Sequence, residues 1–198
     1  MTPRFLFLQN TVGVPPGLQR CAGAAEITVI DQYDFTPDAL TDHQGLLISQ
    51  HIDELHLRDI RDELDAFLAR GGAIAVMGPV AMPYLTQLSP HQTEGTGPAK
   101  DWVLEMAGAH PVMAGVTADD ISYRKGVVGF WARGRIAPIE GAAVVTRFSA
   151  SGAPADWAWE AASGGKLFVH PGNDVWGYAA ETTSAARVFP QMLAWMAA

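Results

Sequence analysis

A polar run near the C-terminus holds the side chains best suited to chemistry. His170 is followed by a proline, a glycine, Asn173 and Asp174, and the run directly follows the apolar segment at residues 167–169. An imidazole near a carboxylate can move a proton, so His170 and Asp174 are candidates for an acid–base pair. The same residue types also form a good turn, because Pro fixes φ, Gly allows positive φ, and Asn and Asp bond to their own backbone. A turn alone and a turn that is also a site both stay open at this point.

A second polar group follows another apolar segment, at residues 45–49. Gln50 and His51 come first, and a helical segment that contains His56 follows. An imidazole here would serve a metal or proton-transfer site if it lay near His170. The alternative is that acidic residues stabilise the start of the helix and the histidines are partly exposed. His51 and His56 are five residues apart, which is not the i, i+4 spacing of a helical zinc motif, so we predict no metal ligands.

The first half of the chain predicts the strands and the helix that would position these groups. Four short apolar segments are typical of buried parallel strands, namely residues 4–10, 27–30, 45–49 and 73–77. Between the last two, residues 57–68 carry apolar side chains on one helical face, with Asp53 as a predicted N-cap. Strand, helix and strand at this spacing predict a βαβ unit, which belongs to a parallel sheet.

The second half of the chain favours a different arrangement. Three further segments resemble strands, namely residues 127–131, 143–148 and 156–160. Gly and Pro turns separate them without room for helices, so we expect antiparallel strands added to the edge of the parallel sheet. Residues 102–106 favour a short helix. Residues 182–195 favour a final helix, which Pro190 should kink or restart.

Composition limits the classes of protein to which the chain can belong. It has 198 residues, of which 48% are hydrophobic and 17% charged, as in an ordinary globular domain with a full core. The net charge of -8 argues against a nucleic-acid surface. The single cysteine, Cys21, excludes an intramolecular disulfide and a cysteine-based zinc cluster. Without a signal peptide or a transmembrane window, we expect a soluble cytoplasmic protein that uses no cofactor and no membrane.

The order of these features resembles the class I glutamine amidotransferase-like fold. In the amidotransferases, a Gly-Gly helix stop and a central strand lead to a sharp turn that carries a nucleophilic Cys, and residues 69–78 match this context. A late strand ends there in a His-Pro-Glu motif, and residues 168–172 match it in part. The resemblance implies one domain over residues 1–198, a flavodoxin-like α/β three-layer sandwich with a mostly parallel sheet and an added antiparallel section.

Within that fold, the chain is most similar to the ThuA-like (trehalose utilisation) proteins. The features that carry this similarity are His-Pro-Val at residues 110–112, Asp119 and Asp120 with Tyr123, and Ala158-Trp159 before residues 164–166. This resemblance covers residues 4–196. It favours a carbohydrate as the ligand.

Departures from the amidotransferase motifs argue against glutamine hydrolysis. Met77 occupies the predicted nucleophile position, and a thioether cannot be deprotonated or form the required thioester. Gly172 replaces the Glu of the His-Pro-Glu motif, and Asp174 lies two residues further on. Cys21 falls in the first crossover, away from the turn. The chain is therefore not expected to be a functional glutamine amidotransferase.

The leading interpretation is a catalytically degenerate domain that binds a small polar ligand at the carboxyl ends of the strands. The predicted ligand-binding residues are Asn10, Gln50, His51, Met77, Gly78, Asn173 and Trp176. One alternative is a hydrolase or lyase in which His170, oriented by Asp174, activates water with or without a metal at His51. A second is a structural or assembly role, and a homo-oligomer is left open. An anionic substrate would be held by cations of two segments, Arg124 with Lys125 and Arg133 with Arg135, unless these are solvated loop charges.

Overall fold

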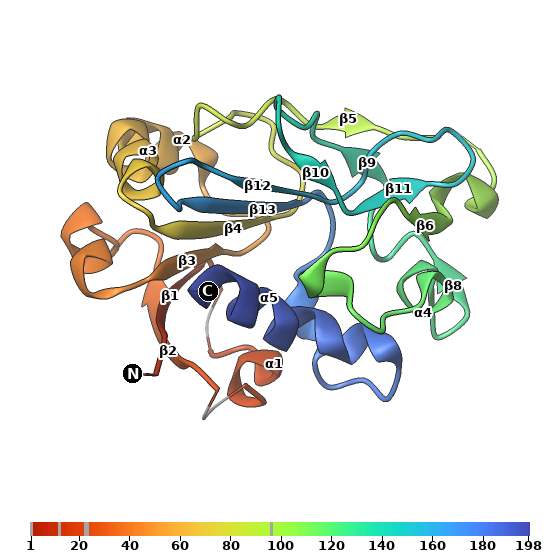
Figure 1. The fold of residues 1–198 in the computed structure, drawn as a ribbon, viewed down its shortest axis with the longest axis horizontal. Helices are drawn as coiled ribbons and strands as arrows, with labels where there is room; N and C mark the ends of the chain where they lie inside the picture. The colour runs from red at the N-terminus through yellow and green to blue at the C-terminus, as the bar shows by residue number, and fades with distance from the viewer. Residues whose placement is uncertain (1, 12, 22–23, 96) are drawn as a thin grey trace.

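A seven-stranded sheet forms the centre of the protein, whose computed structural model describes residues 2–11, 13–21, 24–95 and 97–198 (Figure 1). The strand order is β10-β12-β13-β4-β3-β1-β2. In chain order the strands are β1 (Arg4–Gln9), β2 (Glu26–Asp31), β3 (Gly45–Ile48), β4 (Ala73–Met77), β10 (Ala143–Val144), β12 (Trp157–Glu160) and β13 (Lys166–His170). β13, β4, β3, β1 and β2 run in parallel, and β12 and β10 add an antiparallel edge. The predicted mostly parallel sheet with an antiparallel section is confirmed.

Helices cover both faces of the sheet, which confirms the predicted α/β sandwich of the flavodoxin-like type (Figure 1). On one face lie α1 (Pro16–Gln19) and α5 (Val188–Ala197), and on the other lie α2 (Glu54–Asp59) and α3 (Arg61–Ala69). The remaining helices are short: α4 (Ala118–Ser122) and the 3-10 helices η1 (Pro37–Asp42), η2 (Ala99–Trp102), η3 (Pro111–Met113), η4 (Val175–Tyr178) and η5 (Ser184–Arg187).

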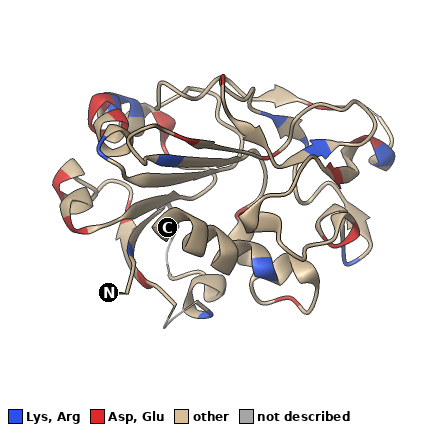
Figure 2. Ribbon diagram, in the orientation of Figure 1, with Lys and Arg blue, Asp and Glu red and all other residues tan. Residues whose placement is uncertain are grey.

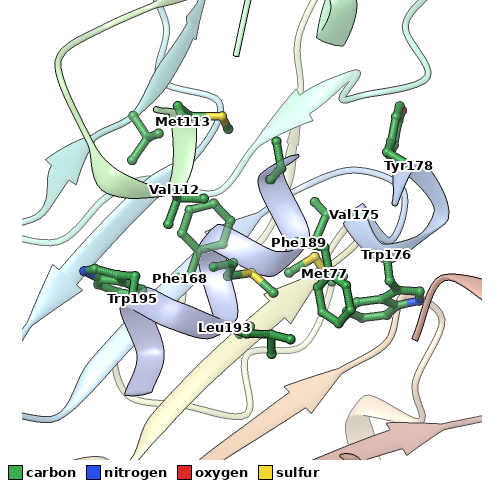
Figure 3. Close-up of a cluster of buried hydrophobic side chains, with 14 of the residues drawn as sticks. Met77, Val112, Met113, Phe168, Val175, Trp176, Tyr178, Phe189, Leu193 and Trp195 are labelled. Atoms are coloured by element: carbon green, nitrogen blue, oxygen red, sulfur yellow. The ribbon is translucent and has the colours of Figure 1, made fainter. Parts of the chain in front are cut away.

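The central strands are apolar along their whole length because each of them contributes to two cores. In β4, Ala75 and Met77 join the cluster under α5, whereas Ile74 and Val76 join the cluster under α2 and α3. This alternation follows from the pleat, which points successive side chains to opposite faces. Figure 3 shows the cluster under α5, where Met77 lies close to Phe189.

The helical predictions hold with two refinements. Asp53 is the N-cap of α2, and its carboxylate accepts hydrogen bonds from the backbone N–H groups of Leu55 and His56 at 3.0 and 3.2 Å. The single helix predicted over residues 57–68 is divided at Ile60 into α2 and α3. Pro190 lies in the first turn of α5, where no backbone N–H is needed, so it fits the start of the helix without a kink.

Three small antiparallel sheets complete the described chain, and they account for the wrong element predictions. They pair β5 (Gln92–Thr93) with β9 (Gly134–Arg135), β6 (Leu104–Met106) with β11 (Thr146–Phe148), and β7 (Tyr123–Arg124) with β8 (Val127–Val128). The helix predicted over residues 102–106 is wrong, because β6 pairs with a strand about forty residues later, which local periodicity does not report. The strand predicted over residues 143–148 is shared between two sheets, β10 in one and β11 in the other.

The charged residues are spread over the outer helices and loops, and both acidic and basic side chains occur on α2 and α3 (Figure 2). Among the helices that the structure describes, none combines the length and apolar character needed to cross a bilayer.

Candidate functional site

The carboxyl ends of three parallel strands meet at one edge of the sheet. β13 pairs with β4 so that His170 lies beside Met77, and β3 pairs with the other side of β4. The turn after the last strand and the bend after the central strand are therefore neighbours, as the sequence predicted. In open α/β sheets this edge is where ligands bind.

A cavity of about 320 Å³ opens at this edge. Three of the predicted ligand-binding residues line it, namely Gln50, His51 and Asn173. Arg133, considered above for an anionic substrate, lines it too, as do His91 and Phe130, for which the sequence predicted no role. Phe130 and Arg133 belong to the segment between β8 and β9, so the cavity lies between the sheet and this segment. Its size suits a small molecule.

His170 does not line the cavity, because its side chain is fully buried behind the wall. Its Nδ1 lies 2.6 Å from Oδ1 of Asp156, and its Nε2 lies 2.8 Å from the carbonyl oxygen of Asn173. A carbonyl oxygen only accepts hydrogen bonds, so Nε2 carries a hydrogen. The short bond at the other nitrogen also holds a proton, on Nδ1 or on Oδ1. His170 therefore has no free lone pair with which to take a proton from water or a nucleophile.

Asp156 is the carboxylate partner of His170, and sequence reasoning missed it. It lies immediately before β12, and the antiparallel register of β12 with β13 places it opposite His170. Its Oδ2 accepts hydrogen bonds from Nε1 of Trp131 at 2.8 Å and from the hydroxyl of Thr146 at 2.5 Å. The carboxyl group of Asp156 thus links the segments that carry Trp131, Thr146 and His170, and each of these side chains has a hydrogen-bond partner inside the protein.

Asp174, the predicted partner of His170, has a different role. Its Oδ1 accepts from the backbone N–H of Gln50 and its Oδ2 from the hydroxyl of Ser49, both at 2.8 Å. Burial raises the pKa of Asp174 above its ordinary value, and the hydrogen bonds from Gln50 and Ser49 oppose that shift. Asp174 therefore ties the loop after β13 to the end of β3 and positions Gln50 at the cavity.

His51 enters the cavity from a strained backbone. It has φ of 62°, which is uncommon for a residue with a side chain, and its side chain is exposed. Asn10 does not line the cavity, but its side-chain amide donates to the carbonyl oxygen of His51 and holds this conformation. Strain of this kind is often kept where a side chain must be presented to a ligand.

Gly78 forms the bend after β4 and supports the site without lining it. Its φ is 88°, and its backbone N–H donates to the carbonyl oxygen of His170 at 2.9 Å. A Cβ at this position would lie 2.7 Å from Cβ of Gln50, so the close approach of these two loops depends on glycine.

Met77 and Trp176 are the two predicted ligand-binding residues that pack in the core instead. Each is 2% exposed and belongs to the cluster under α5 (Figure 3). The indole of Trp176 packs edge-on against Phe7 and Phe189, with ring centroids 4.9 and 5.9 Å apart. The expectation that Trp176 would line the pocket is wrong, because η4 turns its side chain inward toward α5.

Polar contacts join two walls of the cavity, residues 129–133 between β8 and β9 and residues 171–173 after β13. The side-chain amide of Asn173 donates to the carbonyl oxygen of Phe130 at 2.7 Å, and Ala132 forms an antiparallel bridge with Gly172. The ring of Trp131 packs edge-on against His170, with centroids 4.8 Å apart. The buried pair of His170 and Asp156 therefore acts as a support that fixes both walls.

His91 and Cys21 complete the titratable groups of interest. Burial lowers the pKa of His91 below its ordinary value, so its ring is neutral at pH 7. Cys21 is buried in the cluster under α5, and burial raises the pKa of its thiol. Within the described ranges, no three His, Cys, Asp or Glu side chains gather where they could hold a metal ion.

The backbone arrangement matches those of several solved structures. The N-terminal domain of mmIFT52 superposes with a TM-score of 0.60 and 14% identity, covering 98% of this chain and 97% of that one. A Thermoplasma acidophilum protein assigned as part of a GMP synthase gives 0.66 and 8%, covering 100% and 95%. A protein assigned as ThuA-like from Bacteroides uniformis gives 0.54 and 9%, covering 98% and 92%. No protein-family model and no curated protein matches the sequence.

This chain therefore has the amidotransferase-like and ThuA-like fold that the sequence resembles. At such identities the likeness concerns the fold alone. Met77, the position predicted from the sequence for a nucleophile, has its thioether in the core and is followed by Gly78 at the bend. Neither residue offers a nucleophilic atom to the cavity.

Proposed function

We propose that this protein binds a small polar ligand in the cavity lined by Gln50, His51, Phe130 and Asn173, and that it does not hydrolyse glutamine. The observation that carries the proposal is the arrangement of His170. Its two ring nitrogens are engaged by Asp156 and by the Asn173 carbonyl. The residue that would serve as the base instead supports the walls of an open cavity.

The same observation weighs against the hydrolase or lyase alternative. A general base must reach the proton that it removes, through its own lone pair. His170 is fully buried, and its Nε2 already donates to the chain. Asp174 binds Ser49 and Gln50 through both oxygens, which leaves it poorly placed to activate water.

The cavity itself has the features of a binding site. It combines polar side chains, Gln50 and Asn173, with the face of Phe130, which is 40% exposed. Aromatic faces beside hydrogen-bonding groups suit a ring-shaped polar molecule. The resemblance to ThuA-like proteins favours a carbohydrate as that molecule.

Restoring a thiol should not restore glutamine hydrolysis. In Met77→Cys the new thiol would lie in the cluster under α5, beside a His170 whose ring nitrogens are both engaged. We expect no ammonia release from glutamine above the rate of the wild-type protein, and slow reaction of both thiols with Ellman's reagent, since Cys21 is also buried. Measurable glutaminase activity in Met77→Cys would show that His170 can act as a base.

Truncating the aromatic wall should weaken ligand binding. A panel of monosaccharides, sugar acids and sugar phosphates is screened by thermal shift, since a ligand that prefers the native state raises the midpoint. The best compound is then titrated into ¹⁵N-labelled protein. We expect the amide signals of Gly129, Arg133 and Asn173 to move, and Phe130→Ala to weaken binding about tenfold, the loss of about 1.4 kcal/mol of ring contact.

Tyr123→Ala is the matched control for Phe130→Ala. Tyr123 is similarly exposed, at 45%, and lies on neighbouring β7 without lining the cavity. Its truncation should leave the affinity unchanged. The proposal fails if no compound moves the signals of the cavity residues, or if both variants weaken binding equally.

A further inference from the structure

We infer that the ligand of this cavity carries a negative charge, and that Arg133 is the residue that recognises it. This inference rests on the proposed function and adds the chemical class of the ligand. The charged group is a carboxylate or a phosphate, because a guanidinium binds both through paired N–H donors.

The lining of the cavity is basic, whereas the protein as a whole is acidic. The chain has a net charge of -8, with 21 acidic residues against 13 Lys and Arg. None of the described residues that line the cavity is acidic, while Arg133 is basic and both His51 and His91 offer ring nitrogens. A cavity that excludes carboxylates from its wall in an acidic protein favours an anion over a cation.

Several arginines of this protein have a glutamate partner, and Arg133 is not one of them in the described part of the chain. Among the described residues, four arginines are paired with a glutamate: Arg4, Arg124, Arg135 and Arg147. Within the part of the chain that the structure describes, Arg133 has no such carboxylate partner. Its neighbour Arg135 takes Glu94 at 3.1 Å, which removes that carboxylate as a competitor.

The guanidinium of Arg133 is nevertheless held in place. Its Nε donates to the carbonyl oxygen of Gly129 at 3.0 Å, and its Cζ lies 4.8 Å from the ring centre of Trp102. Over residues 2–11, 13–21, 24–95 and 97–198, its two terminal nitrogens, Nη1 and Nη2, have no hydrogen-bond partner. A guanidinium fixed by its inner nitrogen and its flat face, with its outer donors free, is pre-organised for an anion.

Neutral polar groups around the cavity complete the recognition. His91 is neutral at pH 7 because burial lowers its pKa, so it adds a hydrogen-bonding nitrogen without a second full charge. Gln50 is fixed through its backbone by Asp174, whose carboxyl oxygens accept hydrogen bonds from Gln50 N–H and the Ser49 hydroxyl. These groups suit the hydroxyls of a polar ligand whose charge lies at Arg133.

Three sugars that differ in one group test the inference: glucose, glucuronate and glucose 6-phosphate. Each is titrated into ¹⁵N-labelled protein at low ionic strength. We expect at least one anionic sugar to bind about tenfold more tightly than glucose, the gain of a charge-assisted hydrogen bond. Comparison of the two anions shows whether a carboxylate or a phosphate is preferred. Added salt should weaken the anions and leave glucose unchanged, because Arg133 is exposed.

Arg133→Gln and Arg70→Gln form a matched pair of variants. Arg70 is also exposed, and its Cζ lies 4.9 Å from the ring centre of Phe67. It is the C-cap of α3 and does not line the cavity. Arg133→Gln should bring the affinity for the anionic sugar down about tenfold, to that of glucose, while Arg70→Gln keeps it. A thermal melt of each variant checks that it is folded.

The outcomes separate the two proposals. If glucose binds as tightly as the anions and moves the cavity signals, the cavity is a ligand site and the inference of a charged ligand is wrong. If Arg133→Gln and Arg70→Gln weaken the anion equally, the effect is general charge and Arg133 is not the recognising residue. If neither anionic sugar moves a cavity signal, the inference of an anionic ligand is overturned, whereas the proposed function fails only if no compound of the wider panel moves one.

Discussion

Asp156→Ala lowers the free energy of unfolding by about 3–5 kcal/mol, because it removes one partner of a buried pair and leaves the other unpaired. Both Asp156 and His170 are fully buried, and the carboxylate is also the acceptor for Trp131 and Thr146. Its removal leaves three donors without partners in a dry interior, which adds to the loss. Urea unfolding followed by tryptophan fluorescence measures the change.

Asp156→Asn is the control that separates charge from hydrogen bonding. An asparagine can accept from Trp131 and Thr146 through its oxygen and donate to Nδ1 of a neutral His170. We therefore expect a smaller loss, of about 1 kcal/mol. A loss below about 1 kcal/mol in Asp156→Ala would falsify the assignment of His170 and Asp156 as the support of the cavity walls.

Gly172→Ala should have the second largest effect, a loss of about 3 kcal/mol together with loss of ligand binding. A Cβ on Gly172 would overlap the carbonyl oxygen of Trp131 and lie 2.9 Å from Nε2 of His170. Neither residue can move freely, because the side chains of Trp131 and His170 are both hydrogen-bonded to the carboxyl of Asp156. The substitution must therefore break the bridge between Gly172 and Ala132 and open the cavity wall.

Gly177→Ala provides the matched comparison. Gly177 lies five residues further on, in η4, and a Cβ there would meet no atom of the described residues within 4 Å. It should change the free energy of unfolding by less than about 0.5 kcal/mol and leave the amide signals of the cavity in place. Equal effects of the two substitutions would mean that the close approach at Gly172 does not hold the wall. Urea unfolding and the NMR titration described above measure both.

The sheet was predictable because its central strands are buried on both faces. A continuous apolar run such as residues 73–77 has few alternatives when a Gly-Gly helix stop precedes it. Topology then brought Gln50, His51 and Asn173 together, because parallel strands deliver their carboxyl ends to one edge. The part of the site that depends on strand order was therefore within reach of sequence reasoning.

The rest of the site depends on contacts between distant segments. Phe130 and Arg133 reach the cavity through irregular chain between β8 and β9, which carries no period that places it. Trp176 was misplaced because the direction of its side chain is set by the turn of η4, not by its distance from Asn173. One missed residue did have a signal: pairing residues 156–160 against 167–169 in an antiparallel register sets Asp156 opposite His170.

The glycine at the bend after β4 limits which side chains the bend can carry. Met77 packs in the core, so a thiol exposed at this bend would have to replace Gly78. Because Gly78 approaches Gln50 so closely, the loop after β3 would first have to withdraw. His170 would also have to release the Asn173 carbonyl before it could accept a proton. No single substitution meets both conditions, so a thiol placed at this bend would not by itself create a working thiol–imidazole pair.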